Sequence, residues 1–208
     1  MSPFTVLTAV AAPLDIAKID TGMIVPGRFQ RKPRRPGHTD YAQVFLHDLR
    51  FDEHENPRPD FVLNQPAYQN AGILVTGRDF GCGSSRESAA YATLDFGVRA
   101  LIGTSFGDVY RSNCMQNGVL TITLPQPVVQ DFFDKLKAAP GTTLSVDLPS
   151  QTVTGPGGAK HLFDIDATRK ERLLKGLDDV RVTLQQLPQI EAFEAQYRKD
   201  MPWLRHIL

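Results

Sequence analysis

The chain has 208 residues, 41% hydrophobic and 22% charged, which is an ordinary composition for a globular protein. Its 23 lysines and arginines balance 23 aspartates and glutamates, so no overall charge draws it toward nucleic acid or an acidic membrane. No apolar run approaches the roughly 20 residues of a membrane span and no signal peptide is evident, so we expect a cytoplasmic protein without nucleic-acid or membrane partners.

The first forty residues predict short elements separated by turns. Residues 4–10 alternate apolar side chains with Thr and Ala, which predicts a strand that Pro13 ends. Residues 20–22 indicate a turn, and residues 23–25 a short extended piece. Residues 27–39, GRFQRKPRRPGHT, hold five basic residues, two prolines and two glycines without periodicity, so they are either a binding loop or a solvated linker.

The stretch AGILVTGRDFGCGSSRESAAYATLDF, residues 71–96, predicts a strand, a turn and a helix in direct succession. Residues 72–75 form a short apolar run that includes β-branched side chains, as is typical of a buried strand. Gly81 and Gly83 flank Cys82 where the backbone must reverse, and glycine tolerates the positive φ of such turns. Ser84 and Glu87 have the spacing of a capping box, so the sequence predicts a helix start at this point.

The remaining elements predict an α/β domain with added strands and a helical tail. Strands at 98–102 and 119–124 alternate with helices at 105–117 and 128–138, which favours parallel strands with right-handed crossovers. Helical spacing predicts one apolar stripe on each helix, formed by Phe106, Val109 and Tyr110 on the first and by Val129, Phe132, Phe133 and Leu136 on the second. Three further strands, at 143–148, 151–154 and 160–165, are joined by tight turns and predict antiparallel pairing. We expect one domain over residues 1–208, with a helical tail from about 167. The tail begins with a helix that ends at Gly176 and includes an amphipathic helix at 189–199, in which Ile190, Phe193 and Tyr197 share a face.

The helix start after the glycine turn is a candidate anion site. Unpaired backbone N–H groups and the helix dipole favour negative charge there, and Ser84, Ser85 and Arg86 add hydroxyl donors and a guanidinium that matches a carboxylate. The alternative is that Ser84 only caps the helix and Arg86 is solvated. A phosphate-binding loop would need a lysine that is absent, and a dinucleotide site would need a third glycine where Arg86 stands.

The two cysteines predict neither a metal site nor a disulfide framework. Cys82 and Cys114 lie 32 positions apart and lack the Cys/His spacing of metal ligands. Cys82 lies in the candidate site, but no histidine nearby in sequence would activate it as a nucleophile.

Residues 80–87, FGCGSSRE, closely resemble the signature of the swivelling domain of the aconitase superfamily, as carried by 3-isopropylmalate dehydratase small subunits. Further similar segments span nearly the whole chain and lie at residues 20–26, 59–64, 113–120, 164–166 and 176–178. The resemblance implies a swivelling β/β/α domain that docks on a large subunit, and the chain length suits a separate small subunit.

The same resemblance implies a hydro-lyase that isomerises 2-isopropylmalate and 3-isopropylmalate by dehydration and rehydration, in leucine biosynthesis. It implies a four-iron, four-sulfur cluster held by three cysteines of the large subunit, which the two cysteines of this chain could not replace. By likeness, Ser84 corresponds to the general base, while Ser85 and Arg86 bind substrate carboxylates.

Three departures from the family pattern bear on the substrate. Ser88 stands where the family usually has histidine, and Gly22 where a second aspartate is usual. Residues 27–39 occupy the place where the family sets side-chain preference. Isopropylmalate is therefore the leading expectation, while methylmalate/citraconate, dimethylmalate and homocitrate-type substrates remain alternatives. A non-catalytic anion-binding module is the alternative from a different functional class.

Overall fold

The computed structural model describes residues 1–30, 35, 38–83 and 86–204, and the statements below concern these residues. The chain divides into two compact units, Met1–Gly176 and Leu177–Leu208. The first unit contains the sheet and the candidate site, and the second contains the helices that end the chain. Each unit is described by itself.

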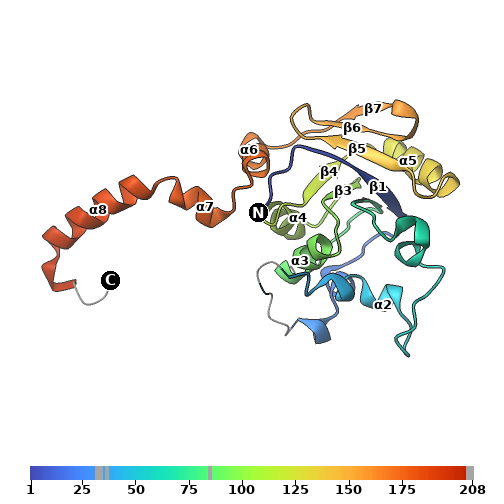
Figure 1. Cartoon of the computed structure of the whole chain (residues 1–208), viewed down its shortest axis with the longest axis horizontal. Coiled ribbons are helices and arrows are strands. Elements are labelled where there is room, and N and C mark those ends of the chain that lie inside the picture. The colour runs from blue at the N-terminus through green and yellow to red at the C-terminus, as the bar shows by residue number, and fades with distance from the viewer. Residues whose placement is uncertain (31–34, 36–37, 84–85, 205–208) are drawn as a thin grey trace. The chain divides into compact units, whose positions relative to one another are not determined.

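The described strands of the first unit form one mixed sheet of seven strands in the order β4-β3-β2-β1-β5-β6-β7. Its parallel part consists of β1 (Val6–Leu14), β2 (Ile73–Thr76), β3 (Ala100–Gly103) and β4 (Leu120–Thr123). Its antiparallel part adds β5 (Thr143–Asp147), β6 (Thr152–Thr154) and β7 (Lys160–Leu162). The predicted change from parallel to antiparallel strands is therefore confirmed (Figure 1).

The long strand β1 joins the two parts of the sheet. Its first half pairs antiparallel with β5 and its second half pairs parallel with β2. The prediction that Pro13 ends the strand was wrong, because β1 continues to Leu14. The carbonyl of Leu14 faces β2 and the N–H of Ala11 faces Thr142, so the nitrogen of Pro13 lies on the side where pairing with β5 has already stopped. A missing N–H costs no ladder hydrogen bond there.

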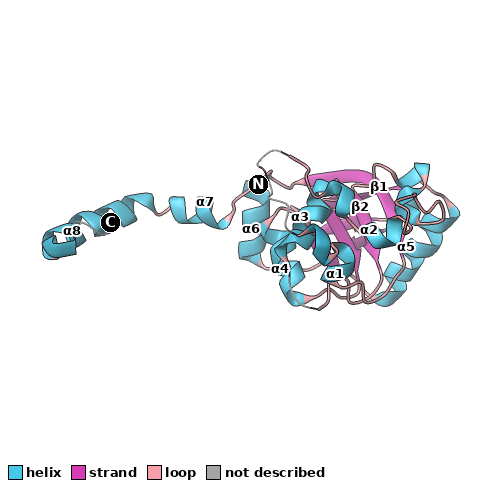
Figure 2. Cartoon of the chain, turned by 90° about the horizontal axis from the view of Figure 1, so that it is seen from below, coloured by secondary structure: helices cyan, strands magenta, loops and turns pink. Residues whose placement is uncertain are grey.

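Helices cover both faces of the parallel strands. Alternate strand residues pack on one side against α1 (Thr21–Ile24), α2 (His47–Arg50), α3 (Glu87–Asp95) and α4 (Asp108–Gln116). On the other side they pack against α5 (Gln126–Ala138) and α6 (Ala167–Lys175). In Figure 1, α2 and α3 lie below the strands and α5 lies to their upper right, beside β5, and Figure 2 shows the sheet from the side of α1 to α4. Burial on both faces explains why β2, apart from Thr76 at its end, and β3 are apolar.

Helix α5 follows its sequence pattern closely. The predicted apolar stripe of Val129, Phe132, Phe133 and Leu136 is fully buried.

Helix α6 ends as predicted at Gly176, which adopts the left-handed conformation of a helix C-cap. Leu173 of α6 is buried and its carbonyl accepts a hydrogen bond from the Phe4 N–H, so α6 belongs to the first unit rather than to the tail.

Three local predictions were wrong. Met23 and Ile24 are not extended, because they complete the short helix α1, although Val25 after them has extended backbone. From the sequence alone, residues 41–47 could form a short helix. The structure instead has a 3-10 turn at Ala42–Val44 and then α2, with Leu46 at φ 51° between them. Val109 was expected in a buried stripe of α4 but is 53% exposed. The carboxylate of Asp20 caps α1 and so starts a helical turn at residues 21–24. Val109 shows that an apolar side chain on a helix need not face the core.

The second unit consists of α7 (Asp179–Leu184), α8 (Leu187–Asp200) and a 3-10 turn at Pro202–Leu204. The carboxylate of Asp178 caps α7 by accepting a hydrogen bond from the Arg181 N–H. Phe193 and Tyr197 share a face of α8 as predicted, and their rings stack with centroids 5.6 Å apart. Neither α7 nor α8 buries a residue in the described structure.

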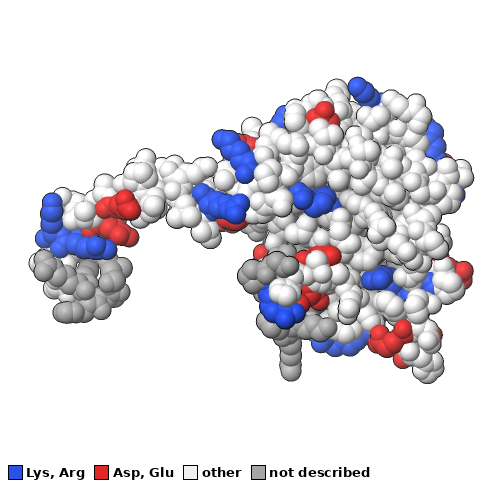
Figure 3. All heavy atoms as spheres, viewed as in Figure 1, with Lys and Arg blue, Asp and Glu red and all other residues white. Residues whose placement is uncertain are grey.

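Charged side chains of both signs are mixed on the face of the molecule that Figure 3 shows. On the face shown in Figure 3, lysines and arginines are interspersed with aspartates and glutamates, which agrees with the balanced composition. Among the described helices, none is long and apolar enough to cross a bilayer.

Candidate functional site

The segments that leave β1, β2 and β3 run side by side beyond the carboxyl ends of these strands. The Gly81 N–H donates to the Ile19 carbonyl at 2.7 Å, and the Thr21 N–H donates to the Cys82 carbonyl at 3.1 Å. On the other side, the Gly107 N–H donates to the Phe80 carbonyl at 2.9 Å. Ligands of parallel α/β sheets bind at this edge, so the glycine turn of the signature lies where a site is expected.

Glycine is required at position 81 for two reasons. Its φ is +75°, and a Cβ atom there would lie 2.1 Å from Cδ1 of the buried Tyr110 ring. Gly107 is equally close to this turn, since its Cβ would lie 2.2 Å from the Gly81 carbonyl oxygen. The predicted glycine turn is confirmed, and its glycines also allow the turn to lie directly against α4.

The substitution Gly81→Ala is expected to lower the free energy of unfolding by about 2–5 kcal/mol, because it combines left-handed strain with overpacking against Tyr110. Urea unfolding followed by circular dichroism measures this loss. Gly157→Ala is the matched control, because Gly157 has φ +79° but nothing within 4 Å of its Cβ position. The control should lose only about 1–2 kcal/mol, and equal losses would show that contact with Tyr110 is unimportant.

Arg86 lies directly before α3. The helix begins at Glu87, and Arg86 is its N-cap with extended backbone and no side-chain capping bond. The predicted capping box was therefore wrong, because Glu87 is the first helical residue rather than the third. The Glu87 carboxylate instead accepts a hydrogen bond from Nδ2 of Asn117, at the end of α4, at 3.3 Å.

The guanidinium of Arg86 faces the segment that follows β1. Cβ atoms built on Gly22 and Gly27 would each lie 3.8 Å from its Nη1. With its amide oxygen turned toward Arg86, Gln30 accepts hydrogen bonds from Nε at 3.1 Å and Nη1 at 2.5 Å. The described beginning of the basic loop thus lies at the candidate site, and Arg86 is half-buried against it rather than solvated.

Ser84 and Ser85 lie outside the described residues, so their roles stay predictions. Gly83 and Arg86, the described residues on either side of them, are both close to the turn at residues 20–22. A Cβ on Gly83 would lie 3.4 Å from the Cβ of Asp20, and Arg86 faces Gly22.

Asp20 holds that turn in place. Its Oδ1 accepts hydrogen bonds from the N–H groups of Gly22 at 2.6 Å and Met23 at 2.9 Å, which makes it the N-cap of α1. The sequence predicted a turn here but missed the cap, although an aspartate followed by a polar residue and glycine is a recognisable signal.

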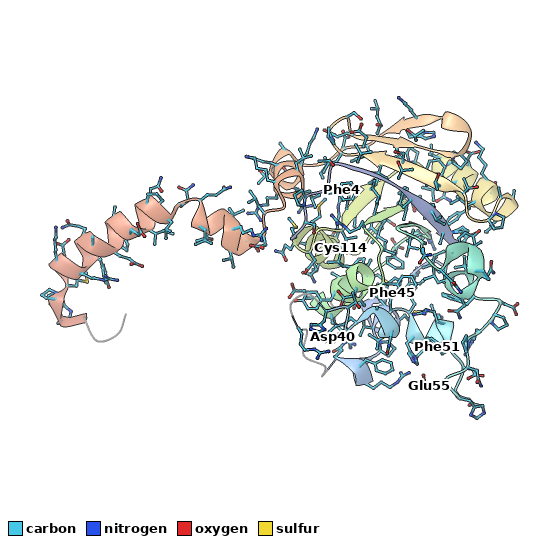
Figure 4. All side chains as sticks on the ribbon, viewed as in Figure 1. Phe4, Asp40, Phe45, Phe51, Glu55 and Cys114 are labelled. Carbon is cyan, nitrogen blue, oxygen red and sulfur yellow. The ribbon has the colours of Figure 1, made fainter. Side chains whose placement is uncertain are left out.

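A second cluster, missed by the sequence analysis, fixes the start of the basic loop. Arg28 pairs with Asp48 through a forked contact, in which Nη1 donates to Oδ2 at 2.9 Å. His47 is buried and its ring contacts the rings of Phe29 and Phe51, and its Nε2 lies 2.9 Å from Glu55. Figure 4 labels Phe51 and Glu55 in this region. These contacts therefore hold the 3-10 turn at Gly27–Phe29, which directly precedes Gln30, in place.

The Arg28–Asp48 pair makes stability depend on pH. Hydrogen bonding to Arg28 lowers the pKa of Asp48 from 3.8 to about 2. Because the folded pKa lies below the unfolded one, the contribution is present above pH ~4 and lost as pH falls through ~2. Both side chains are about half exposed, so solvent screening limits it to at most about 1 kcal/mol.

Asp48→Asn is therefore expected to lower the free energy of unfolding at pH 7, and the difference from the wild type should shrink toward pH 2. Urea unfolding at several pH values measures this. A difference that persists unchanged at pH 2 would mean that charge on Asp48 is not its source.

The described residues do not form a metal site. None of their His, Cys, Asp and Glu side chains gather in a group of three or more suited to a metal ion. Cys114 is buried inside the fold (Figure 4), and burial raises the pKa of its thiol to about 12. It therefore remains a protonated thiol at neutral pH, whereas a metal ligand must be a thiolate.

Family models match most of the chain. The aconitase C-terminal domain matches residues 1–127, and the model described as LeuD_N matches residues 130–167. The model for the C-terminal domain of 3-isopropylmalate dehydratase small subunits matches residues 182–206.

Individual relatives match over their whole length. The chain is 48% identical to the 3-isopropylmalate dehydratase small subunit of Jannaschia sp., over 98% of this chain and 100% of that protein. It is 45% identical to the Dinoroseobacter shibae protein of the same name, with the same coverage. The solved 3-isopropylmalate dehydratase structure from Methanocaldococcus jannaschii has a TM-score of 0.66 over 90% of this chain and 99% of that chain, at 19% identity. This likeness confirms the predicted fold, and the sequence identities show that the chain belongs to the family of 3-isopropylmalate dehydratase small subunits of the aconitase superfamily.

Proposed function

We propose that this chain is the small subunit of a hydro-lyase that interconverts 2-isopropylmalate and 3-isopropylmalate by removing and readding water, a step of leucine biosynthesis. The observation that carries the proposal is the 48% identity to a small subunit of that name over the full length of both chains. The position of Arg86 supports it, because a half-buried guanidinium at the carboxyl edge of the parallel strands suits a dicarboxylate substrate.

Each signature residue has a proposed role. Arg86 binds one substrate carboxylate with its guanidinium, and Ser85 donates a hydrogen bond to a carboxylate. Ser84 is the general base that takes the proton from the carbon next to the carboxylate. A serine hydroxyl is a poor base unless its alkoxide is stabilised. We propose that the positive potential at the start of α3 and the guanidinium of Arg86, two positions further along the chain, supply this stabilisation.

The chain needs a large subunit as its partner. The described residues contain no ligand set for an iron–sulfur cluster, and Cys114 is buried and protonated. We propose that the four-iron, four-sulfur cluster is held by cysteines of the large subunit. When bound, such a cluster supplies a Lewis acid for the leaving hydroxyl group, while this chain binds the carboxylates and moves the proton.

Reconstitution tests the proposal. The chain is mixed with a 3-isopropylmalate dehydratase large subunit, iron and sulfide, and the absorbance of the unsaturated acid is followed after addition of 3-isopropylmalate. We expect activity only in the complete mixture. A higher kcat/KM with methylmalate, dimethylmalate or a homocitrate-type acid would change the substrate assignment. Inactivity with all of them, together with tight calorimetric binding of dicarboxylates to the chain alone, would indicate a non-catalytic anion-binding module instead.

A further inference from the structure

We propose that Gln30 is a positioning residue for Arg86, which orients the guanidinium for the substrate carboxylate without neutralising its charge. This inference rests on the proposed function, because it assigns Arg86 to substrate binding. It adds a residue outside the signature and within the basic loop.

The contact involves two of the three guanidinium nitrogens. The amide oxygen of Gln30 accepts from Nε at 3.1 Å and from Nη1 at 2.5 Å. The contact with Gln30 uses Nε and Nη1, and we assign the remaining nitrogen, Nη2, to a substrate oxygen. A long arginine side chain has several rotatable bonds, and a fixed contact at two nitrogens removes the entropy cost of ordering it when substrate binds.

The backbone around the contact has room for this arrangement. Gly22 and Gly27 have no side chains, and Cβ atoms at these positions would approach Nη1 to 3.8 Å. The guanidinium therefore lies over two glycines, and its described side-chain acceptor comes from Gln30. Gln30 is itself held near the site, because the preceding residues are anchored by the Arg28–Asp48 pair.

The neutrality of the acceptor matters. A carboxylate at this position would form an ion pair with Arg86 and compete with the substrate carboxylate for it. An amide oxygen fixes the geometry and leaves the full positive charge. Position and charge can therefore be separated by two substitutions, Gln30→Leu, which removes the acceptor, and Gln30→Glu, which keeps an acceptor oxygen but adds a negative charge.

A spectroscopic measurement tests the contact itself. In the full-length chain, the Nε–H signal of Arg86 is identified in ¹H–¹⁵N spectra by its loss in Arg86→Lys, and its exchange with water is measured. We expect slow exchange in the wild type and in Gln30→Glu, and fast exchange in Gln30→Leu. The matched control is Gln43→Leu, the same chemical change at an exposed glutamine, which should leave the signal unchanged. An unaltered Arg86 signal in Gln30→Leu would refute the proposal.

Kinetics of the reconstituted enzyme test the consequence. Both Gln30 variants are expected to raise KM for 3-isopropylmalate about tenfold, with kcat changed less than about threefold. The loss of one charge-assisted hydrogen bond typically weakens binding by about this factor. Arg28→Gln loosens the same loop without removing the Arg86 contact and should raise KM less. Equal effects of Arg28→Gln and Gln30→Leu would overturn the positioning role in favour of general loop order. An inactive wild-type complex would refute the proposed function, while the Arg86 signal would still decide whether Gln30 holds the guanidinium.

Discussion

Replacing Ser84 by alanine is expected to lower kcat of the reconstituted enzyme about 10³-fold and to change KM little. A positioned general base typically contributes 10²- to 10⁴-fold, and the methyl group of alanine cannot accept a proton. Since Ser84 is assigned to proton transfer and not to carboxylate binding, its loss should act on the transition state alone. Steady-state rates of 3-isopropylmalate dehydration, with saturating large subunit, measure the effect.

Ser150→Ala is the control for this substitution. Ser150 lies in the turn between β5 and β6. This turn follows Asp147 of β5, which pairs with Val6 at the amino end of β1, whereas the candidate site lies beyond the carboxyl end of β1. Ser150 is therefore at the opposite end of the strands from the site. This variant should keep wild-type kinetics. Wild-type kcat in Ser84→Ala would remove the base assignment, and a matching loss in Ser85→Ala would show that the two hydroxyl groups act together.

Removing the charge of Arg86 is expected to raise KM about 100-fold in Arg86→Gln, with a smaller change in kcat. The guanidinium offers a carboxylate two parallel hydrogen bonds and a full positive charge, whereas glutamine offers one neutral donor group. Arg86→Lys keeps the charge but loses the fork, so its KM should lie between those of the wild type and Arg86→Gln. Initial rates over a range of substrate concentrations provide KM and kcat for the three proteins.

Arg169→Gln is the matched control, because Arg169 is an exposed arginine of α6 and the same net charge is lost. Its KM should equal that of the wild type. If both variants raise KM equally, long-range charge explains the effect rather than contact with the substrate. An Arg86→Gln enzyme with unchanged KM would contradict the assignment of Arg86 to carboxylate binding.

The fold was predictable where the evidence is local and periodic. Buried parallel strands are mainly apolar, as in residues 73–75, and α5 repeats its apolar side chains at helical spacing, so both were recognised from the sequence. The signature at residues 80–87 led to the family for the same reason, because its residues are contiguous. Pro13 misled the analysis, because its effect depends on whether a neighbouring strand needs its N–H.

The candidate site was predictable only in part. The sequence identified Arg86 and the glycine turn, but it could not indicate what the guanidinium faces. Gln30 lies 56 positions before Arg86 in the printed sequence, and Arg28 lies 20 positions before its partner Asp48. No sequence periodicity links residues so far apart, and a single glutamine is not part of any sequence motif that would mark it as the partner of an arginine.

The sequence by itself determined the order of the elements, the apolar faces that form the core and the family signature, because each depends on residues close together in the chain. The tertiary structure decided that the segments following β1, β2 and β3 meet at one edge, that Tyr110 leaves room only for glycine at position 81, and that Gln30 reaches Arg86. These contacts join distant parts of the chain, and they form only when parallel strands bring their carboxyl ends to the same side of the sheet.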